Sequence, residues 1–429
     1  MIRIYRTKCN FEREPLISPF GFKGGYLTEL WQAVALVEGF SGKRGVGLGT
    51  QSVLWSDARV FSQNSESAGN AMMFAMTAFA LQHARERCFA DPLQLLDGLL
   101  EPTLDYGRSV TGRPDLRLTF ALNSLVAVDN AAWQFYCAEK GVESFDAMVP
   151  DAFRPALAHR HHELGVIPLV SYGVAVDEIV QAVRDGFFLL KIKIGSDPDR
   201  DGDAEKMLAW DIERLTSIHH AVKDFETPYT DCGHVLYYLD ANGRYDSKER
   251  LLRLIDAADK IGALERIVLV EEPFPEDAEI EVRDIPARVA ADESAHSDAD
   301  AAARIDMGYG AIALKPIAKT LSMTLKIAKV AHERGVPCFC ADLTVNPILV
   351  DWNKNVAARL APLPGVKIGM LETNGHQNYR DWQRMKSYHP RADASWTEMT
   401  GGLFRLDEDF YAASAGIMEQ SEHYLALVS

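Results

Sequence analysis

The sequence has 429 residues, with 45 Lys and Arg against 61 Asp and Glu, so its formal net charge is −16. A chain this acidic repels phosphate backbones and anionic lipids, which argues against nucleic-acid and membrane-surface partners. The length exceeds one ordinary hydrophobic core and predicts either a large α/β domain with a companion or two to three small domains.

Cysteine usage and the first residues indicate a compartment. The six cysteines are scattered without a Cys-x-x-Cys pair, which is typical of a reducing environment, so we expect a cytoplasmic protein. The opening residues, MIRIYRTKCNFERE, are charged from the third position and predict no signal peptide. The most apolar stretch, residues 71–81, has roughly half of the ~20 residues that a membrane span requires, so it predicts a buried helix.

Residues 1–60 carry strand patterns. Residues 2–5 alternate between apolar and polar side chains, and residues 30–37 predict a further strand. Between them, Pro15, Pro19 and the Gly24-Gly25 pair predict breaks. From about residue 65 to residue 162 the pattern turns helical, with a long amphipathic stretch at 122–138, and no strand is evident there.

Beyond residue 165 short apolar runs alternate with helical patterns. The eight runs are 167–172, 187–195, 235–240, 267–271, 289–292, 311–315, 337–342 and 366–372. Continuous apolar strands between helices are typical of a parallel sheet that is buried on both faces, and eight in succession predict a (β/α) barrel. A doubly wound open sheet is the rival, but no Gly-rich fingerprint follows the first strand.

The final residues leave this rhythm. Residues 392–429 have mixed polarity and a Gly401-Gly402 turn, and we expect them to return to the N-terminal part. The fold class expected is therefore α/β, with an N-terminal α+β domain at 1–160, a barrel at 165–390 and a C-terminal segment that completes the first domain.

A charged residue closes seven of the eight apolar runs. These residues are Lys193, Asp240, Glu271, Asp292, Lys315, Asp342 and Glu372. Any one of them is explained equally well as an exposed loop charge. Because the C-terminal ends of barrel strands meet around one cavity, the series predicts an active site at that face.

Three consecutive strand ends carry carboxylates. Asp240, Glu271 and Asp292 would repel one another in a cleft unless a cation neutralised them. Hard oxygen ligands without His or Cys favour Mg²⁺, with Mn²⁺ as the alternative. Such an ion stabilises the negative charge that develops on a carboxylate substrate when its α-proton leaves.

Lysines stand on both sides of these carboxylates in the chain. Lys191 and Lys193 are two residues apart on one strand, so their side chains point the same way, and their mutual repulsion is expected to lower the pKa of Lys193 toward that of a general base. Lys315 would face them from another strand. A Lys-x-Lys pair taken alone is equally typical of an exposed edge strand.

Five motifs in this order resemble those of the enolase superfamily: Lys191-Ile192-Lys193, Asp240-Ala241-Asn242, Glu271-Glu272-Pro273, Asp292-Glu293-Ser294 and Leu314-Lys315-Pro316. They are most similar to the muconate-lactonizing-enzyme subgroup of the mandelate racemase/muconate lactonizing enzyme family. The resemblance implies a modified (β/α)7β TIM-like barrel with an N-terminal α+β capping domain.

The resemblance also implies site roles. Asp240, Glu271 and Asp292 would hold Mg²⁺, and Lys193 and Lys315 would act as acid and base. Lys191 would bind the substrate carboxylate and tune Lys193. The reaction would be abstraction of the proton α to a carboxylate through an enediolate intermediate.

The chain departs from the resembled pattern in several places, including a long connection with an acidic insert between Lys193 and Asp240. Asp342 ends the seventh strand where the mandelate-racemase subgroup has a His, and Leu371-Glu372-Thr373 replaces the Asp-x-Asp of dipeptide epimerases. Thr320-Leu321 stands near the place of a usual Gly-Gly. The capping-domain Gly-x-Gly-Glu reads Gly47-Leu48-Gly49-Thr50. These departures leave the substrate open.

Substrate contacts are expected from capping-domain segments 18–26 and 49–55. Phe20, Phe22 and Lys23 are the candidates, although the two Phe also suit a capping-domain core. On the barrel side, Glu372 and Asp342 would receive a substrate cation or hydroxyl, or pair with a neighbouring lysine.

The function expected is racemisation, epimerisation or cycloisomerisation of a small carboxylate. A dehydratase or o-succinylbenzoate-synthase-like lyase begins with the same proton abstraction and stays open as an alternative. A lysine Schiff-base lyase and a barrel that binds a ligand without catalysis are more distant alternatives. We expect a homo-oligomer without nucleic-acid or membrane partners.

Overall fold

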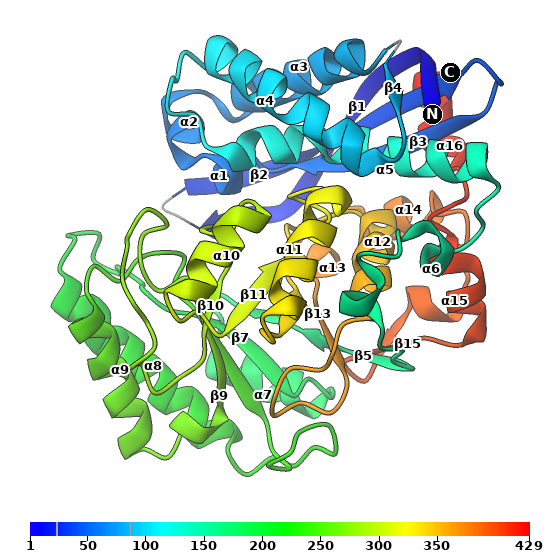
Figure 1. The fold of residues 1–429 in the computed structure, drawn as a ribbon. Coiled ribbons are helices and arrows are strands. Elements are labelled where there is room, and N and C mark those ends of the chain that lie inside the picture. Colours follow the sequence, from blue (N-terminus) through cyan, green and yellow to red (C-terminus); the bar gives the residue numbers. More distant parts are fainter. Residues whose placement is uncertain (23–24, 86) are drawn as a thin grey trace.

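The computed structural model describes residues 1–22, 25–85 and 87–429. The N-terminal part contains an antiparallel sheet of order β3-β2-β1-β4. Its strands are β1 (Ile2–Phe22), β2 (Gly25–Gly39), β3 (Arg44–Gln51) and β4 (Cys88–Phe89). Helices α1 (Val53–Ser56), α2 (Ala58–Gln63), α3 (Glu66–Ala84), α4 (Pro92–Thr111) and α5 (Leu118–Lys140) accompany this sheet, above the barrel in Figure 1.

The breaks expected at Pro15 and Pro19 do not occur. Strand β1 runs through both prolines, and its pairing with β2 shifts register between Pro15 and Phe20. A proline has no N–H to donate, so it is tolerated where the ladder is already irregular. The two-residue strand β4, which pairs with Ile2 and Arg3, was also not evident from the sequence.

Glycines let helix α5 lie directly against β3. A Cβ atom on Gly45 or Gly47 would lie 2.1 Å from the main-chain oxygen of Ala131 or Ala127, respectively. No side chain fits at that distance, so the Gly-x-Gly pattern of this strand serves packing.

The predicted barrel is present, and its first strand closes it. That strand is interrupted at Pro168 into β5 (Glu163–Ile167) and β6 (Leu169–Val170). Strand β5 pairs in parallel with β13 (Gly369–Glu372), and β6 pairs in parallel with β7 (Leu189–Lys193). The two halves of this first strand, β5 and β6, therefore connect the last strand, β13, to β7 and close the sheet.

Between β7 and β13 the strands follow in chain order, namely β8 (Leu236–Asp240), β9 (Ile267–Glu271), β10 (Val289–Ala291), β11 (Ala311–Leu314) and β12 (Cys338–Cys340). The helices are α7 (Val176–Arg184), α8 (Ala204–Val222), α9 (Lys248–Lys260), α10 (Asp298–Asp306), α11 (Leu321–Glu333) and α12 (Pro347–Ala357). Residues 272–288, between β9 and β10, form a loop instead of the expected helix.

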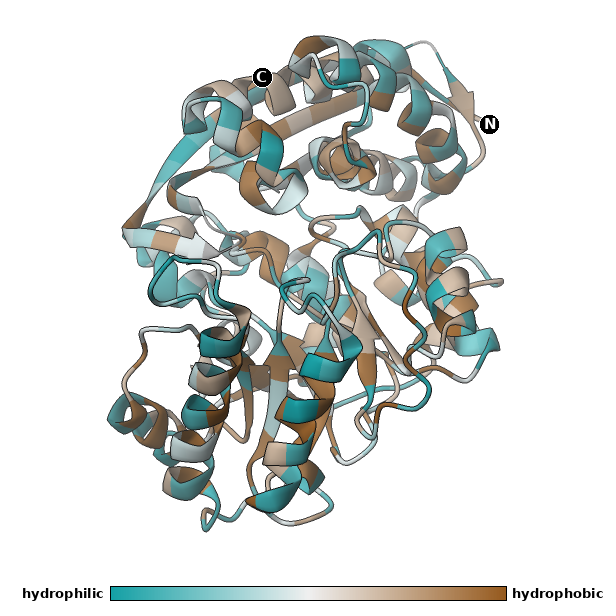
Figure 2. Cartoon of the chain, turned by 90° about the vertical axis from the view of Figure 1, so that its left-hand side faces the viewer, coloured by the Kyte–Doolittle hydropathy of each residue, from teal (hydrophilic) through white to brown (hydrophobic). Residues whose placement is uncertain are grey.

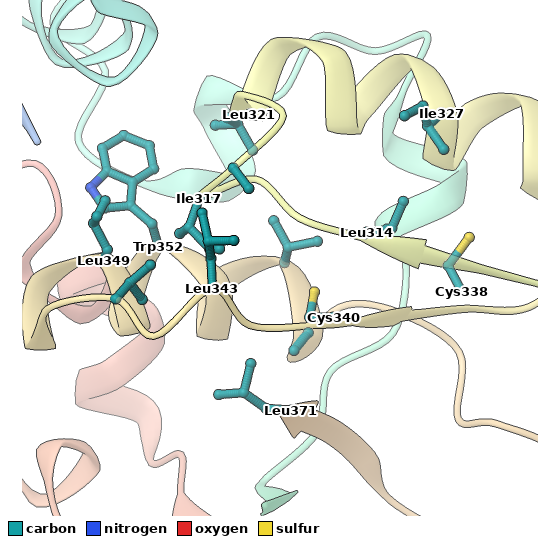
Figure 3. Packing of buried hydrophobic residues seen from close by; sticks show 14 of the residues in the cluster. Leu314, Ile317, Leu321, Ile327, Cys338, Cys340, Leu343, Leu349, Trp352 and Leu371 are labelled. Atoms are coloured by element: carbon teal, nitrogen blue, oxygen red, sulfur yellow. The ribbon is translucent and has the colours of Figure 1, made fainter. Parts of the chain in front are cut away.

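The barrel core is apolar and continuous with its helices. Side chains from β11, β12, β13, α11 and α12 pack together, including Leu314, Cys340, Trp352 and Leu371 (Figure 3). Figure 2 shows brown central strands, with brown and teal alternating along the surrounding helices. This pattern is expected for strands buried on both faces.

The C-terminal residues first extend the barrel sheet and then reach the N-terminal sheet. Strand β15 (Leu403–Arg405) pairs antiparallel with β5 and with β14 (Met399–Thr400). Helix α16 (Glu422–Val428) then contacts β1 and β2. The shorter helices are α6 (Phe145–Met148), α13 (Gly375–Asn378), α14 (Trp382–Ser387) and α15 (Glu408–Ala413), with 3₁₀ turns at Arg154–Leu157, Leu264–Arg266, Ser395–Thr397 and Ser414–Gly416. The expected fold class is confirmed.

Two sequence-based expectations concern the whole chain. All six cysteines are free. Among the described residues, no helix combines the length and the apolar character that crossing a bilayer requires.

Candidate active site

Parallel pairing aligns the charged strand ends. Lys193 lies opposite Asp240, and Asp240 lies opposite Glu271 in the registers of β7, β8 and β9. Since parallel strands in a barrel end at the same face, the charged residues that follow or end the other strands reach the same cavity. Strand β7 is paired on both sides, so the Lys-x-Lys motif is not on an edge strand.

A pocket of about 490 Å³ lies at this face, between the barrel and the N-terminal sheet. Its lining combines lysines and carboxylates with apolar and neutral polar side chains. The lining residues are Phe20, Leu27, Ser52, Trp55, Leu169, Lys191, Lys193, Asp240, Asn242, Asp292, Lys315, Asp342, Leu343, Thr344, Glu372 and Asn374. Six of the seven predicted strand-end charges line it, and the seventh, Glu271, pairs with Lys191, which also lines it.

Three buried acids offer ligand atoms to a metal ion. Glu271, Asp292 and Glu293 each present a carboxylate oxygen within 4.8 Å of the others. Glu271 Oε1 is buried without a hydrogen-bond partner. An all-oxygen donor set with an unsatisfied carboxylate atom fits Mg²⁺. Burial raises the pKa of Glu271 to about 8 despite the nearby Lys191, and Asp292 adds to the rise.

The predicted ligand Asp240 is not in this group of three. Its Oδ2 atom lies 2.5 Å from Lys193 Nζ and 3.0 Å from Lys191 Nζ. Glu293 takes its place beside Glu271 and Asp292, and the Nδ2 of Asn242 donates a hydrogen bond to it. The sequence contained the signal, because Glu293 follows Asp292 directly, but a strand-end pattern selects only one residue per strand.

Three carboxylates surround the ammonium group of Lys191 and balance its charge. Its Nζ lies 3.0 Å from Asp240 Oδ2, 2.9 Å from Glu271 Oε2 and 3.0 Å from Glu372 Oε2. Burial alone would lower the pKa of Lys191, but these acids hold it well above its usual value. Both lysines of the motif reach the same oxygen of Asp240, so they point the same way.

Lys315 approaches from the other side of the carboxylates. It bonds to Asp292 Oδ2, and its ammonium lies 4.9 Å from the ring centre of Trp55. The indole N–H of Trp55 is buried without a partner. Although burial lowers the pKa of Lys315, Asp292 and Glu293 raise it above its usual value.

A further lysine was missed by the sequence reasoning. Lys319 is fully buried, and its Nζ donates to the main-chain oxygens of Asp292 and Ala295 at 2.6 and 3.0 Å. It also lies 3.2 Å from Asp292 Oδ1. Lys319 follows Lys315 in the loop that leads to α11, where nothing in the sequence distinguishes it from a surface lysine.

The structure describes only one of the three capping-domain residues that were predicted to contact substrate down to its side chain. Phe20 lines the pocket and also packs against an apolar cluster that contains Leu27. The side chain of Phe22, and Lys23 altogether, lie outside the described residues. Leu27, Ser52 and Trp55 are the other capping-domain side chains at the pocket.

Strained backbone is concentrated around this face. Asn242, Glu272, Thr320 and Thr344 follow β8, β9, β11 and β12, and their φ angles are +45°, +37°, +71° and +57°. Non-glycine residues with positive φ are uncommon and cluster at functional sites. Thr320 stands near the place of the Gly-Gly in the resembled pattern. Its positive φ is a conformation that glycine adopts without strain.

A larger cavity of about 860 Å³ lies outside the barrel, against α12 and α14. Asp351 pairs there with Lys354 at 2.7 Å and with His389 at 2.9 Å. Thr373 lines this cavity, while its neighbours Glu372 and Asn374 line the other one. The end of β13 therefore separates the two, and the acid, lysine and metal-binding groups belong to the smaller pocket.

Comparison with known proteins identifies the barrel. Residues 174–381 match the family described as "Enolase C-terminal domain-like". The comparison with curated protein sequences found no match. Among solved structures, a mandelate racemase/muconate lactonizing protein from Herpetosiphon aurantiacus is 17% identical, with a TM-score of 0.67 and coverage of 95% of this chain and 96% of that one.

Two further structures share the fold. The dipeptide epimerase from Enterococcus faecalis V583, complexed with Mg and the dipeptide L-Leu-L-Tyr, is 17% identical, with a TM-score of 0.66 and coverage of 95% and 98%. The N-succinyl Arg/Lys racemase from Bacillus cereus ATCC 14579 is 15% identical, with a TM-score of 0.64 and coverage of 95% and 93%. At these identities the likeness concerns the fold.

Proposed function

We propose that this protein, whose residues 174–381 match the enolase C-terminal domain-like family, is a Mg²⁺-dependent enzyme that removes the α-proton of a small carboxylate. One observation carries this proposal. Lys193 and Lys315 enter one pocket from strands that three others separate, and buried carboxylates lie between them. The same fold in two isomerases, an epimerase and a racemase, supports the reaction class.

The metal site draws on four carboxylates. Glu271 and Asp292 would hold the ion, with Asp240 from the predicted set and Glu293 from the observed cluster as further oxygen donors. Bound there, Mg²⁺ supplies positive charge for the oxygens of the substrate carboxylate as the α-proton leaves. Lys191, which the acids hold in its charged form, adds a second positive group for the same oxygens.

The two outer lysines exchange protons with the α-carbon. Lys193 ends β7 and bonds to Asp240 on one side of the acids, and Lys315 approaches on the side of Asp292. With one lysine on each face of the substrate, one takes the proton and the other returns a proton to the opposite face. This arrangement favours racemisation or epimerisation, and cycloisomerisation uses the same intermediate. Elimination of a β-substituent, as in the lyase alternative, begins with the same step.

Deuterium exchange tests the proposal. The Mg²⁺-loaded protein would be incubated in D₂O with a library of chiral carboxylates, and α-deuterium would be measured by mass spectrometry. We expect exchange that EDTA abolishes and Mg²⁺ restores, that Lys193→Ala abolishes for one enantiomer of a substrate, and that the exposed-site control Lys260→Ala retains. Unsaturated products would indicate elimination.

Exchange that survives EDTA, and that survives Lys193→Ala with both enantiomers of a substrate, would overturn the proposal. Trapping of a keto acid on the protein by borohydride would then support the Schiff-base alternative, with Lys193 or Lys315 as the nucleophile.

A further inference from the structure

We propose that the substrate carries a protonated amine as well as its carboxylate, and that Asp342 binds this amine. The inference rests on the proposed function and names the substrate class of the same pocket. It starts from the environment of one carboxylate, which differs from that of every other acid lining the cavity.

Asp342 is buried with an unused oxygen. It follows β12, lines the pocket and is only 6% exposed. Its Oδ2 accepts a hydrogen bond from the N–H of Asn374 at 2.8 Å, whereas Oδ1 has no hydrogen-bond partner. A buried polar atom without a partner is costly, and a ligand that donates to it recovers that cost.

The other acids that line the pocket have lysine partners. Asp240 pairs with Lys191 and Lys193, Asp292 pairs with Lys315 and Lys319, and Glu372 pairs with Lys191. Within residues 1–22, 25–85 and 87–429, no Lys, Arg or His nitrogen lies within ion-pair distance of Asp342. Among the described residues, Asp342 is therefore the acid of this pocket that has no cationic partner, and a ligand cation would fill that place.

The surroundings favour a cation over a neutral donor. Glu372 lies next to Asp342, since its Oε2 accepts the N–H of Asp342 at 3.2 Å. Lys191, which is the lysine paired with Glu372 in the described part of the chain, is shared with Asp240 and Glu271. The pocket is therefore rich in negative charge at β12 and β13, where an ammonium gains more than a hydroxyl does.

The strand order also sets the direction of the substrate. The metal-binding carboxylates belong to β9 and β10, whereas Asp342 follows β12, with β11 and Lys315 between them. A substrate whose carboxylate lies at the metal site would extend past Lys315 toward Asp342. The proposed amine-binding acid, Asp342, thus follows the seventh strand of the barrel. The eighth strand ends in Leu371-Glu372-Thr373 and has no Asp-x-Asp.

Matched compounds test the inference. Each pair would consist of an aminocarboxylate and its analogue with methyl in place of ammonium, with the amine at several distances from the α-carbon. Exchange kcat/KM and binding by calorimetry would be measured with Mg²⁺ present. The proteins would be the wild type, Asp342→Asn, the charge-retaining Asp342→Glu, and the exposed control Asp393→Asn.

We expect at least one amine compound to exceed its analogue in the wild type, and Asp342→Asn to lower its kcat/KM and affinity by roughly 10- to 100-fold, which is typical for loss of a hydrogen bond to a charged group. The analogue should change less than about threefold. Asp342→Glu should keep a preference for the amine, and Asp393→Asn should behave as the wild type.

Two outcomes separate this inference from the proposed function. Metal-dependent exchange without preference for amines, or an equal loss for both compounds in Asp342→Asn, would overturn the amine assignment and leave the function standing. Absence of exchange for every compound would count against the function, and the calorimetric comparison would still decide the amine assignment. Thermal unfolding of each variant would show that it is folded.

Discussion

The Nζ of Lys319 lies 2.6 Å from the main-chain oxygen of Asp292, behind the carboxylate that faces Lys315. Asp292 is thus held by two lysines, one of which faces the pocket while the other is fully buried. Although burial raises the pKa of Asp292, the two lysines together hold it below its usual value. Lys319 is a positioning residue whose removal should disturb both the fold and the metal site.

Replacing Lys319 with Met should destabilise the protein by about 3 kcal/mol, because breaking a buried ion pair leaves the partner charge uncompensated. The metal site should weaken with it. Urea unfolding and Mg²⁺ titration by calorimetry would measure both effects. Lys329→Met, in the helix α11 that follows Lys319 and with a side chain that is 39% exposed, is the matched control and should change stability by less than about 0.5 kcal/mol. Unchanged Mg²⁺ affinity in Lys319→Met would contradict the positioning role.

The two outer lysines should show opposite stereochemical defects. Lys193→Ala and Lys315→Ala should each lose about 10²- to 10⁴-fold in exchange kcat/KM, one with the first enantiomer of a substrate and the other with the second. The physical reason is that each lysine reaches only one face of the α-carbon. Exchange rates measured separately on the two enantiomers would show the split. Equal losses with both enantiomers in both variants would contradict the two-face arrangement.

The contributions of Asp240 and Glu293 to metal binding can be separated. We expect Asp240→Asn to weaken Mg²⁺ binding more than Glu293→Gln, which should cost about 10-fold, as is typical for a group that supports ligands through hydrogen bonds. The reason is that Asp240 is paired across neighbouring strands with Glu271, whereas Glu293 accepts a hydrogen bond from Asn242. Isothermal titration of each variant with Mg²⁺ would rank them. The reverse order would make Glu293 the direct ligand.

Asp342 should also impose a pH dependence on stability. Burial raises the pKa of Asp342 to about 6, and the neighbouring Glu372 adds to the rise. The folded state therefore binds this proton more tightly than the unfolded state, whose Asp pKa is about 3.9. The contribution of Asp342 to stability is fully present below the unfolded-state pKa and is lost as the pH rises through the folded-state pKa.

Above pH 7 this carboxylate should cost about 3 kcal/mol, so Asp342→Asn should be more stable than the wild type at pH 8 by that amount and close to it at pH 4. Urea unfolding at the two pH values would measure the difference. An equal difference at both would show that titration of Asp342 does not contribute.

Thr320 offers a test of backbone strain. Its φ of +71° and ψ of 154° lie in a region that is essentially restricted to glycine, and its side chain caps α11 by accepting from Met323 N–H. Thr320→Gly should stabilise the protein by about 1 kcal/mol, because relief of strain exceeds the small loss from replacing a cap by glycine. Thr320→Ala keeps the strain and loses the cap, so it should destabilise. Chemical denaturation of the three proteins would check the signs.

Local patterns predicted much of this architecture. Apolar runs such as 267–271 and 311–315 form strands, because the strands of a parallel sheet that is buried on both faces are continuously apolar. The charged residues that close these runs mark the face at which the parallel strands end. The prediction of strand breaks at the prolines of β1 was wrong. The effect of a proline depends on whether the neighbouring strand needs an N–H at that point. The helix expected between β9 and β10 is replaced by a loop at residues 272–288.

The sequence by itself determined the order of the strands and which charged residue ends each of them, since both follow from hydrophobic periodicity along the chain. Only the tertiary structure decided the partners of those charges. It buried Lys191 among three acids, brought Glu293 beside Glu271, and set Lys319 behind Asp292. It also left Asp342 without a cation among the described residues. Such partnerships depend on how side chains from distant strands point into one low-dielectric cavity, and spacing within a strand does not contain that information.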